Sequence, residues 1–321
     1  MPRPKGSKME ETKLSVAERI EKSLSEIKEK LPNLDLRENE MMNTHSSFKT
    51  GGPVRAFIVP QDVNSMSIIC SIIKDNCLMP YILGNCTNVV FPDEGTAELI
   101  VISTEKLRNM FLLPDGSVYA EAGVPLSVLA SFAQENGLAG LEFASGIPGT
   151  VGGGIIMNAG AYGGEIKDVI DTVVVYYLPE QRLYEMNNEN CRFSYRHSVF
   201  QTMAGCLILS AVFKLEAGDG DEIAARMKEL NERRREKQPL DLPSAGSAFR
   251  RPEGRYAAAL IEEAGMKGHA VGGAQVSEKH AGFIINKGGA SAKDILDLIN
   301  EVQKRVFDMS GVRLEPEVRL L

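Results

Sequence analysis

The feature that most constrains this chain is a glycine-rich segment near its middle. Residues 137–164 read GLAGLEFASGIPGTVGGGIIMNAGAYGG and hold ten of the chain's 30 glycines. Because glycine loses the most backbone entropy on folding, such density is costly unless the backbone needs a positive φ or the close approach of a ligand. Bare N–H groups in a loop, or at a helix N-terminus, bind an anionic diphosphate. A set of strand bends and turns is the alternative.

Two common diphosphate-binding motifs are absent from the sequence, which limits the kinds of ligand that the segment could bind. No GxxxxGKS or GxxxxGKT is present, which argues against a P-loop, and no GxGxxG joins a strand to a helix, which argues against a Rossmann nicotinamide site. A second short loop, LGNCTNVV at 83–90, places small and amide residues directly after a strand-like run. The two loops could therefore hold one long dinucleotide from either end.

The composition argues against several classes of protein. A net charge of −7 disfavours general nucleic-acid binding, which needs a basic face. No apolar run approaches the ~20 residues of a membrane-spanning helix, and the first 40 residues lack the apolar core of a signal peptide. The five cysteines form no CxxC pair, and the four histidines lie far from cysteine pairs. We therefore expect reduced thiols, no metal site and a cytoplasmic protein.

Hydrophobic periodicity predicts alternating helices and strands. Residues 1–13 are polar and are expected to form a disordered tail, followed by an amphipathic helix that begins with a capping box at Ser15 and Glu18. A domain boundary is expected at 215–220, where the sequence reads EAGDGD. The predicted strands are RAFIVP, LMPYIL, ELIVIS, SVYAEAG, TVVVYYL, CLILSAVFKL and the final PEVRLL. Further helices are predicted at 125–135, at 219–237 and between Ser291 and Gly311.

The stretch PSAGSAFRRP at 243–252 sets Ser247 among small residues. A nucleophilic role is disfavoured, because AGSAF lacks the GxSxG elbow and no other pattern supplies a serine-hydrolase triad. A turn serine and a proton donor both stay open on the residues alone. The stretch SSFKTGG contains both SxxK and KTG, but the two motifs share Lys49, whereas penicillin-interacting enzymes carry them on separate elements. That match is therefore spurious.

Six stretches of the sequence, in order, are similar to the motifs of one enzyme family. They are NTHSSFKTGGPV, LGNCTN, GLEFASGIPGTVGGGIIMNAGAYGGEI, CRFSYRHSVF, QPLDLPSAGSAFRRP and LEPEVR. From about residue 43 to the end, the chain resembles the UDP-N-acetylenolpyruvoylglucosamine reductase family, whose flavoenzymes make UDP-N-acetylmuramate for peptidoglycan and so serve cell-wall biogenesis, cell shape and cell division. Only 51 positions separate Arg196 from Ser247 (247 − 196), which resembles the shorter subclass that lacks an inserted tyrosine-bearing loop.

The resemblance implies an α+β, FAD-binding fold shared with the vanillyl-alcohol-oxidase group. Residues 1–42 would be the tail and amphipathic helix, 43–217 two subdomains holding non-covalent FAD, and 218–321 an α+β substrate-binding domain. The family usually carries Gly-Ser where this chain has Cys86-Thr87, so flavin affinity or loop geometry could differ. The residues implied to contact FAD are Gly84, Asn85, Cys86, Thr87, Asn88, Gly146, Ile147, Pro148, Gly149, Thr150, Gly152, Gly153, Asn158, Ala159 and Gly160.

The resemblance also implies the reaction. NADPH would reduce FAD, and the flavin would deliver hydride to the vinyl carbon of UDP-N-acetylglucosamine enolpyruvate that is distal to its carboxylate. The enolate that develops needs a cation or acid beside it and a positioned proton donor. Ser247 would donate the proton, and Arg196 and Glu317 would stabilise the intermediate. NADPH and the sugar nucleotide would bind in turn at one site. Substrate contacts are implied for Lys237, Tyr195, His280 and Arg251.

Two other functions stay open. One is an oxidase or 2-hydroxy-acid dehydrogenase of the same flavin fold, although many of these attach FAD through a histidine in the loop equivalent to 84–88, which this chain lacks. The other is a flavin- or nucleotide-sugar-binding protein without activity, if Cys86 has weakened the site. Arg196, Ser247 and Glu317 together favour the reductase, since a binding module needs no such set. The residues leave the oligomeric state open, with a monomer favoured.

Overall fold

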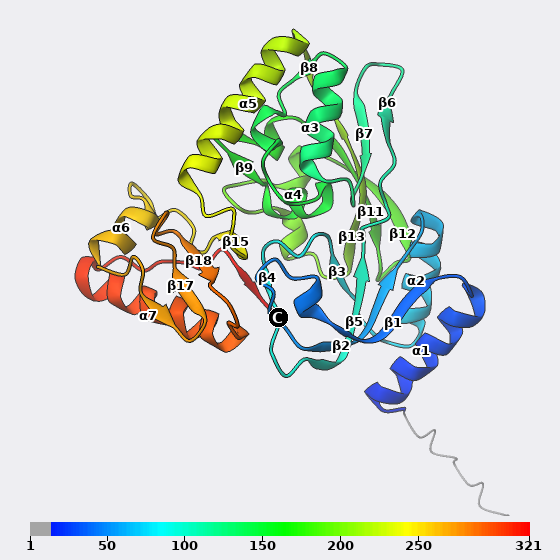
Figure 1. Cartoon of the computed structure of the whole chain (residues 1–321). Coiled ribbons are helices and arrows are strands. Elements are labelled where there is room, and N and C mark those ends of the chain that lie inside the picture. Colours follow the sequence, from blue (N-terminus) through cyan, green and yellow to red (C-terminus); the bar gives the residue numbers. More distant parts are fainter. Residues whose placement is uncertain (1–13) are drawn as a thin grey trace, which may run out of the picture.

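The computed structural model describes residues 14–321, so the disordered tail expected at 1–13 lies outside the described residues. The chain folds into an N-terminal unit (residues 14–103), a middle unit (104–237) and a C-terminal unit (238–321). Each unit is built on one main β-sheet, and Figure 1 shows the three units grouped around a common centre, with the C-terminus close to it. The α+β class expected for this chain is confirmed.

The N-terminal unit has a four-stranded sheet in the order β1-β2-β5-β3. β1 pairs antiparallel with β2, whereas β2 and β3 both pair parallel with β5. The predicted strands RAFIVP, LMPYIL and ELIVIS are confirmed as parts of β2, β3 and β5, whereas the sequence analysis does not predict β1. The strands are β1 (Asp35–Met41), β2 (Pro53–Val59), β3 (Tyr81–Leu83) and β5 (Thr96–Ser103), with β4 (Val89–Val90) outside the sheet.

Two helices belong to this unit. α1 (Val16–Lys30) begins at the predicted capping box of Ser15 and Glu18, and its apolar stripe is buried against α2 (Val63–Asp75). α2 is not among the helices predicted from the sequence. Its run of isoleucines has the β-branched composition of a buried strand, although the Asp62 side chain caps the helix.

The middle unit has a five-stranded antiparallel sheet in the order β12-β11-β13-β7-β6. The predicted strands SVYAEAG, TVVVYYL and CLILSAVFKL are confirmed as parts of β7, β11 and β13, and the helix predicted at 125–135 is α3. A short helix, α4, forms within the glycine-rich segment, where the sequence analysis predicts none. The main elements are β6 (Met110–Leu112), β7 (Val118–Glu121), α3 (Leu126–Glu135), α4 (Val151–Met157), β11 (Ile170–Tyr177), β12 (Arg182–Asn187) and β13 (Cys206–Phe213). Four short strands are β8 (Leu138–Ala139), β9 (Gly160–Ala161), β10 (Gly164–Glu165) and β14 (Glu216–Ala217).

The helix predicted at 219–237 forms as α5 (Gly220–Lys237), but it packs on a different part of the molecule from the one expected. α5 contacts α3 and the turn that precedes Gly146, and Figure 1 shows it lying beside α3. Its contacts are therefore with the middle unit. The domain boundary expected at 215–220 precedes this helix and stays a prediction.

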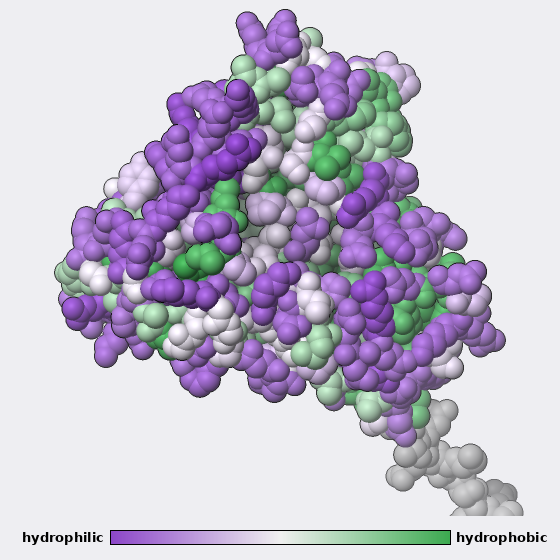
Figure 2. Space-filling model, in the orientation of Figure 1, coloured by the Kyte–Doolittle hydropathy of each residue, from purple (hydrophilic) through white to green (hydrophobic). Residues whose placement is uncertain are grey.

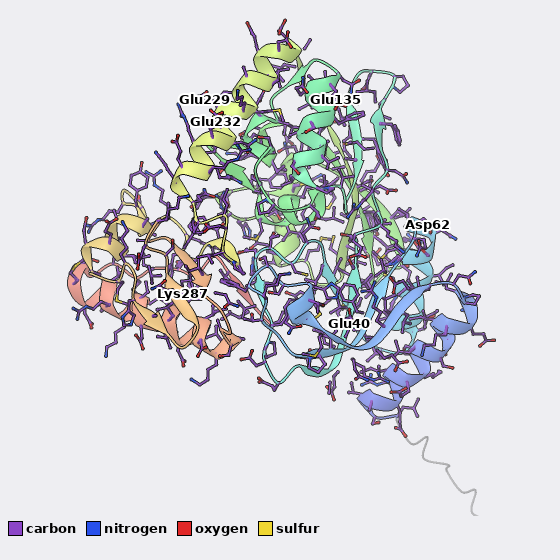
Figure 3. The ribbon with its side chains drawn as sticks, viewed as in Figure 1. Glu40, Asp62, Glu135, Glu229, Glu232 and Lys287 are labelled. Carbon is purple, nitrogen blue, oxygen red and sulfur yellow. The ribbon has the colours of Figure 1, made fainter. Side chains whose placement is uncertain are left out.

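The two faces of α5 carry different charges. On the outer face Glu229 forms ion pairs with Arg226 and Arg233, and Figure 3 shows Glu229 on the outside of the helix. On the inner face Arg234 and Lys237 point into the molecule, where they line a cavity. The cations on the outer face of α5 thus form surface ion pairs, whereas those on the inner face line an internal cavity.

The C-terminal unit has a four-stranded antiparallel sheet in the order β15-β18-β17-β16, which packs with two helices. The helix predicted between Ser291 and Gly311 is confirmed as α7, with a capping box at Ser291. Gly311 ends it at φ +69, a conformation that glycine adopts without a steric penalty. The elements are β15 (Ser244–Ser247), α6 (Ala257–Glu263), β16 (Ala270–Val271), β17 (Ala274–Val276), β18 (Phe283–Asn286) and α7 (Ala292–Ser310).

The last residues of the chain join the C-terminal unit to the N-terminal unit. The predicted strand PEVRLL is reduced to β19 (Arg319–Leu320), which pairs parallel with β4. Phe48 and Val90 of the N-terminal unit are buried in the core of the C-terminal unit. The Asp93 carboxylate also accepts hydrogen bonds from two backbone N–H groups in the first turn of α7. A shared core, a strand pair and a helix cap thus fix these two units to each other.

Candidate active site

A cavity of about 1150 Å³ lies where the three units meet. Figure 2 shows the surface hollowed near the centre of the molecule, with hydrophilic and hydrophobic residues both bordering the hollow. The first loop (residues 84–88) and the second loop (residues 146–153) both contribute to its wall. Its volume exceeds the ~300–1,000 Å³ of sites for single small ligands, so a dinucleotide and part of a second molecule can share it.

Most residues assigned to the site from the sequence line this cavity. The three catalytic candidates, Arg196, Ser247 and Glu317, come from a turn before β13, from β15 and from the segment before β19. The lining FAD candidates are Gly84, Asn85, Cys86, Thr87, Asn88, Gly146, Ile147, Pro148, Gly149, Thr150, Gly152, Gly153, Ala159 and Gly160, and the lining substrate candidates are Tyr195, Lys237, Arg251 and His280. Their contacts with ligands stay predictions.

Asn158 differs from the other predicted FAD contacts, because it is fully buried and does not line the cavity. It ends α4 at φ +43. Its Nδ2 donates to the Glu165 carboxylate and to the Ser194 carbonyl, each at 3.0 Å, and its Oδ1 accepts from the Lys167 N–H at 3.0 Å. Asn158 therefore anchors the turn that carries Arg196 through Ser194, and both N–H groups of its side-chain amide are used within the protein.

The glycines of the rich segment serve packing as well as the cavity wall. A Cβ at Gly146 would overlap the Asn231 side chain of α5, and one at Gly164 would lie 2.5 Å from Phe143 Cδ1. Neither glycine has a positive φ, so the close approach of neighbouring elements, rather than a turn, requires glycine there. The glycine density of this segment thus has two causes, the predicted approach of a ligand and the close packing of neighbouring elements.

Cys86 holds the first loop in a left-handed conformation, with φ +49. Such a φ favours glycine, so a cysteine there carries some strain. Its side chain is buried in an apolar cluster that includes Leu83 and Phe91. Burial raises the pKa of the Cys86 thiol to about 12. The departure from Gly-Ser therefore places a protonated thiol in the wall beneath the loop.

Arg196 is presented by a tight turn between Ser194 and His197, which exchange both backbone hydrogen bonds at 3.0 and 3.1 Å. Arg196 itself has φ +53, which is uncommon outside glycine and is concentrated at functional sites. Its Nε donates to Glu317 Oε1 at 2.8 Å, and its Nη2 donates to the Gly160 carbonyl at 2.9 Å. The guanidinium is therefore fixed from two sides while it lines the cavity.

Glu317 lies where three parts of the chain converge. Its N–H donates to the Ala248 carbonyl at 2.9 Å, next to Ser247, and its carbonyl accepts from Asn88 Nδ2 of the first loop at 3.0 Å. Its carboxylate accepts from Arg196 of the middle unit. Burial raises the pKa of Glu317, and the nearby Arg196 charge offsets only part of that effect. One residue thus links the first loop, the Ser247 strand and the Arg196 turn.

Ser247 ends β15 opposite Phe283 of β18. The pairing register shifts between Ser244 and Ser247, and Gly246 between them has φ +76. Such an irregularity changes the direction in which a strand presents its side chains. Ser247 is exposed and lines the cavity, and among residues 14–321 no group hydrogen-bonds to its hydroxyl. The hydroxyl is therefore available to a ligand.

His280 has a defined tautomer. The Gly282 N–H donates to its Nδ1 at 3.1 Å, so the Nδ1 atom is an acceptor and the proton of the neutral ring is on Nε2. Burial lowers the pKa of His280, which favours this neutral form. The ring packs edge-on against Phe283, with centroids 5.0 Å apart. His280 can thus donate one hydrogen bond into the cavity.

The charge of the cavity is opposite to that of the whole protein. Among the described residues that line it, the cations are Arg196, Arg234, Lys237, Arg251 and Arg319, and the single acid is Glu317, a net charge of +4 (5 − 1). The chain as a whole carries −7. An internal excess of cations in an acidic protein fits ligands that bear phosphates or carboxylates.

The polar lining residues that the sequence-based assignment does not include are headed by Arg234, Gln201 and Arg319. Arg234 lies one helical turn before Lys237, and burial lowers the pKa of its guanidinium. Arg319 lies two positions after Glu317, on the same face of an extended segment. Helix and strand spacing from an assigned residue could have identified both, whereas Gln201 carries no such signal.

Two further findings concern the described part of the chain alone. Within residues 14–321, no group of three or more His, Cys, Asp or Glu side chains could hold a metal ion. None of the helices that the structure describes has the length and apolarity needed to cross a membrane.

Comparison with known proteins gives consistent results. Residues 238–321 match the family model described as UDP-N-acetylenolpyruvoylglucosamine reductase, C-terminal domain, and residues 54–178 match the model described as FAD binding domain. The UDP-N-acetylenolpyruvoylglucosamine reductase of Caldanaerobacter subterraneus subsp. tengcongensis is 45% identical, over 93% of this chain and 97% of its own length. That of Clostridium novyi is also 45% identical, over 94% of this chain and 96% of its own length. The crystal structure of UDP-N-acetylenolpyruvylglucosamine reductase from Thermus caldophilus has a TM-score of 0.76 at 30% identity, and covers 90% of this chain and 98% of its own.

Proposed function

This chain belongs to the UDP-N-acetylenolpyruvoylglucosamine reductase family, and we propose that it reduces UDP-N-acetylglucosamine enolpyruvate to UDP-N-acetylmuramate with NADPH. The relatives and the FAD-binding domain make it an FAD-containing oxidoreductase. The observation that carries the finer proposal is the presence of Arg196, Ser247 and Glu317 in one cavity with both loops. The proposal includes a cytoplasmic monomer that acts in peptidoglycan precursor synthesis.

The residues of the cavity fit FAD. Asn85 Nδ2 donates to the Pro148 carbonyl at 3.2 Å, which joins the first loop to the second. A Cβ built on Gly149 would find no atom closer than 3.8 Å, so the wall is open to a ligand there. Bound against these loops, FAD would supply to the substrate the hydride that NADPH provides. Residues 84–88 contain no histidine, so the proposed attachment is non-covalent.

Ser247 is the proposed proton donor. Once hydride reaches the distal vinyl carbon, the carbon beside the carboxylate becomes an enolate carbon that must accept a proton. Serine is a weak acid, so the transfer depends on the basicity of the enolate and on placement of the hydroxyl within hydrogen-bond reach. The free, cavity-facing hydroxyl of Ser247 supports this role, and exchange with water would restore its proton.

Arg196 and Glu317 are proposed to stabilise the enolate. The Arg196 guanidinium uses Nε and Nη2 for protein contacts, which leaves N–H donors for the substrate carboxylate. A negative Glu317 beside an enolate would be repulsive, whereas a protonated Glu317 can donate a hydrogen bond to it. The raised pKa of Glu317 favours that protonated form. Its Oε1 accepts from Arg196, so the other oxygen is the proposed donor.

The sugar nucleotide and NADPH are proposed to occupy the same cavity in turn. Lys237 and Arg234 line it from the end of α5, and Arg251 lines it from the C-terminal unit, where its guanidinium lies 4.0 Å from the ring centroid of Tyr256. These cations support binding of the diphosphate, and the tyrosine supports stacking of a base. Strong simultaneous binding of both nucleotides would argue against the shared site. The substrate-binding domain is proposed as residues 238–321, because α5 packs on the middle unit.

A second cavity of about 280 Å³ supports NADPH rather than NADH as the reductant. It shares Tyr195 and Arg251 with the large cavity, and Arg250 and Arg313 also line it. Glu253 and Glu315 line it too, and Glu315 pairs with Arg250 at 3.6 Å, so the three arginines exceed the acids by one charge (3 − 2). Arg250 Nε is buried without a hydrogen-bond partner among the described residues, and Arg313 packs over Phe307. Guanidinium groups bind phosphate bidentately, and the 2′-phosphate is what distinguishes NADPH from NADH. We therefore place that phosphate in the second cavity.

Arg313→Gln tests this placement. The substitution is expected to lower kcat/KM for NADPH by about tenfold, because one charge-assisted hydrogen bond to phosphate is lost. The value for NADH should stay within about twofold, since NADH has no phosphate at that position. Steady-state assays with both nucleotides measure the ratio, with Arg305→Gln on the exposed face of α7 as the control. An equal loss with both nucleotides would show that the second cavity does not bind the 2′-phosphate.

Turnover tests the function itself. The FAD-loaded protein, given NADPH and UDP-N-acetylglucosamine enolpyruvate, should convert one substrate for each NADPH oxidised. The product should be heavier than the substrate by two hydrogen atoms, which mass spectrometry measures. NADPH oxidation that consumes oxygen and yields no such product would indicate an oxidase instead.

A further inference from the structure

The Gln201 carboxamide lies between two residues of the candidate active site. Gln201 ends a 3-10 turn (Val199–Gln201) shortly after the Arg196 turn. Its Nε2 donates to the Arg196 carbonyl at 3.0 Å and to the Ile156 carbonyl of α4 at 2.9 Å. Its Oε1 accepts from the Arg319 Nη2. Both N–H groups and the oxygen of the amide are therefore in use.

These contacts join the Arg196 turn on one side of the cavity to Arg319 on the other. Arg196 has a left-handed backbone, which needs support from its surroundings to persist. Gln201 supplies that support by joining the Arg196 carbonyl to α4. Arg319 lies on β19 beside Glu317, and its backbone N–H donates to the Asn88 carbonyl of the first loop. Gln201 thus ties the Arg196 turn to the C-terminal segment that carries both Glu317 and Arg319.

We propose that Gln201 is a positioning residue that holds Arg196 and Arg319 in register across the cavity. The inference rests on the proposed reductase function. An amide is suited to this place, because it donates two hydrogen bonds and accepts one without a charge of its own. Glutamate would keep the acceptor for Arg319 but would put a carboxylate against two carbonyl oxygens. Lysine would keep the donors to the carbonyls but would repel Arg319.

Gln201→Glu and Gln201→Lys separate the two contacts. In Gln201→Glu the Arg196 turn loses its support, so the rate of flavin reoxidation by the enolpyruvyl substrate should fall by about 10–100-fold. In Gln201→Lys the turn keeps its donors, so that rate should stay within about threefold of wild type. The dissociation constant of the substrate, measured on oxidised enzyme without NADPH, should instead rise about tenfold, because Arg319 is displaced.

The controls separate positioning from loss of structure. Gln134 on α3 also donates to a backbone carbonyl, that of Gly220 at 3.0 Å, but lies outside the cavity lining. Gln134→Glu should therefore leave both quantities unchanged. The thermal unfolding temperature of each variant shows whether it is folded, and its flavin content shows how much of it carries FAD. Rates are compared per flavin-loaded protein. Equal changes of rate and affinity in both Gln201 variants, or no change in either, would overturn the inference. A wild-type protein that fails to reoxidise with the substrate would instead overturn the proposed function on which it rests.

Discussion

Ser247→Ala is expected to leave flavin reduction by NADPH at its wild-type rate and to slow flavin reoxidation by the enolpyruvyl substrate by about 10²–10⁴-fold, the usual range for a general acid. The two half-reactions separate because only the second requires a proton on carbon. Removing the hydroxyl also leaves β15 and its pairing with β18 intact, since among the described residues the hydroxyl has no hydrogen-bond partner. Anaerobic stopped-flow absorbance measures the two rates independently.

Two further variants make this result specific. Ser247→Cys keeps a side-chain proton donor and should recover part of the second rate. Ser131→Ala, on the exposed face of α3 and outside the cavity lining, should change neither half-reaction. If Ser247→Ala slows both half-reactions equally, the residue supports the site as a whole and is not the acid.

Glu317→Ala is expected to reduce the second half-reaction by about 10²–10³-fold, comparable with the loss of one preorganised donor to a developing oxyanion. The substitution removes the proposed hydrogen bond to the enolate and also frees the Arg196 guanidinium, whose Nε is bound to Glu317 at 2.8 Å. Glu317→Gln keeps a neutral donor of similar size, so it should retain more of the rate than Glu317→Ala. Single-turnover reoxidation of both variants gives the comparison. A rate in Glu317→Gln below that in Glu317→Ala would show that the negative carboxylate is the active form.

The raised pKa of Glu317 gives this prediction a pH dependence with a definite sign. Burial keeps the carboxyl protonated to a higher pH than usual, despite the Arg196 charge. The protonated fraction falls as pH rises through this raised pKa, so the second half-reaction should slow toward high pH. Glu317→Gln has no proton to lose, and its profile should lack that decline. A wild-type rate that instead falls as pH is lowered through this range would contradict the assignment of the protonated form.

Sequence periodicity predicts the fold best where elements are long and alternate regularly. The strands at β2, β11 and β13 and the helices α1 and α7 have clear apolar patterns and recognisable caps. α2 is missed because half of its buried residues are isoleucine, a β-branched residue that is also typical of buried strands. The unit on which α5 packs cannot be predicted from periodicity, which shows which face of a helix is apolar but not which unit covers it. That information depends on contacts with α3 and with the turn before Gly146.

The sequence predicts a residue of the candidate site where that residue lies in a recognisable motif. The two loops, Arg196, Ser247 and Glu317 are assigned through short distinctive stretches, and the structure brings all of them to one cavity. Asn158 lies in such a stretch, but its side chain is buried and bonds to Glu165, Ser194 and Lys167 rather than lining the cavity, which a one-dimensional pattern does not reveal. Gln201 acquires its contact with Arg319 only through the return of the C-terminal strand, 118 positions later.

The most direct test of the central claim is the visible spectrum of the purified protein, followed anaerobically through two additions. The protein is expected to be yellow, to be bleached by NADPH and to be recoloured by UDP-N-acetylglucosamine enolpyruvate, with one substrate consumed per flavin. Recolouring by oxygen alone would contradict the reductase and favour an oxidase. A colourless protein that fails to take up FAD would contradict the cofactor assignment and direct attention to the strained first loop at Cys86.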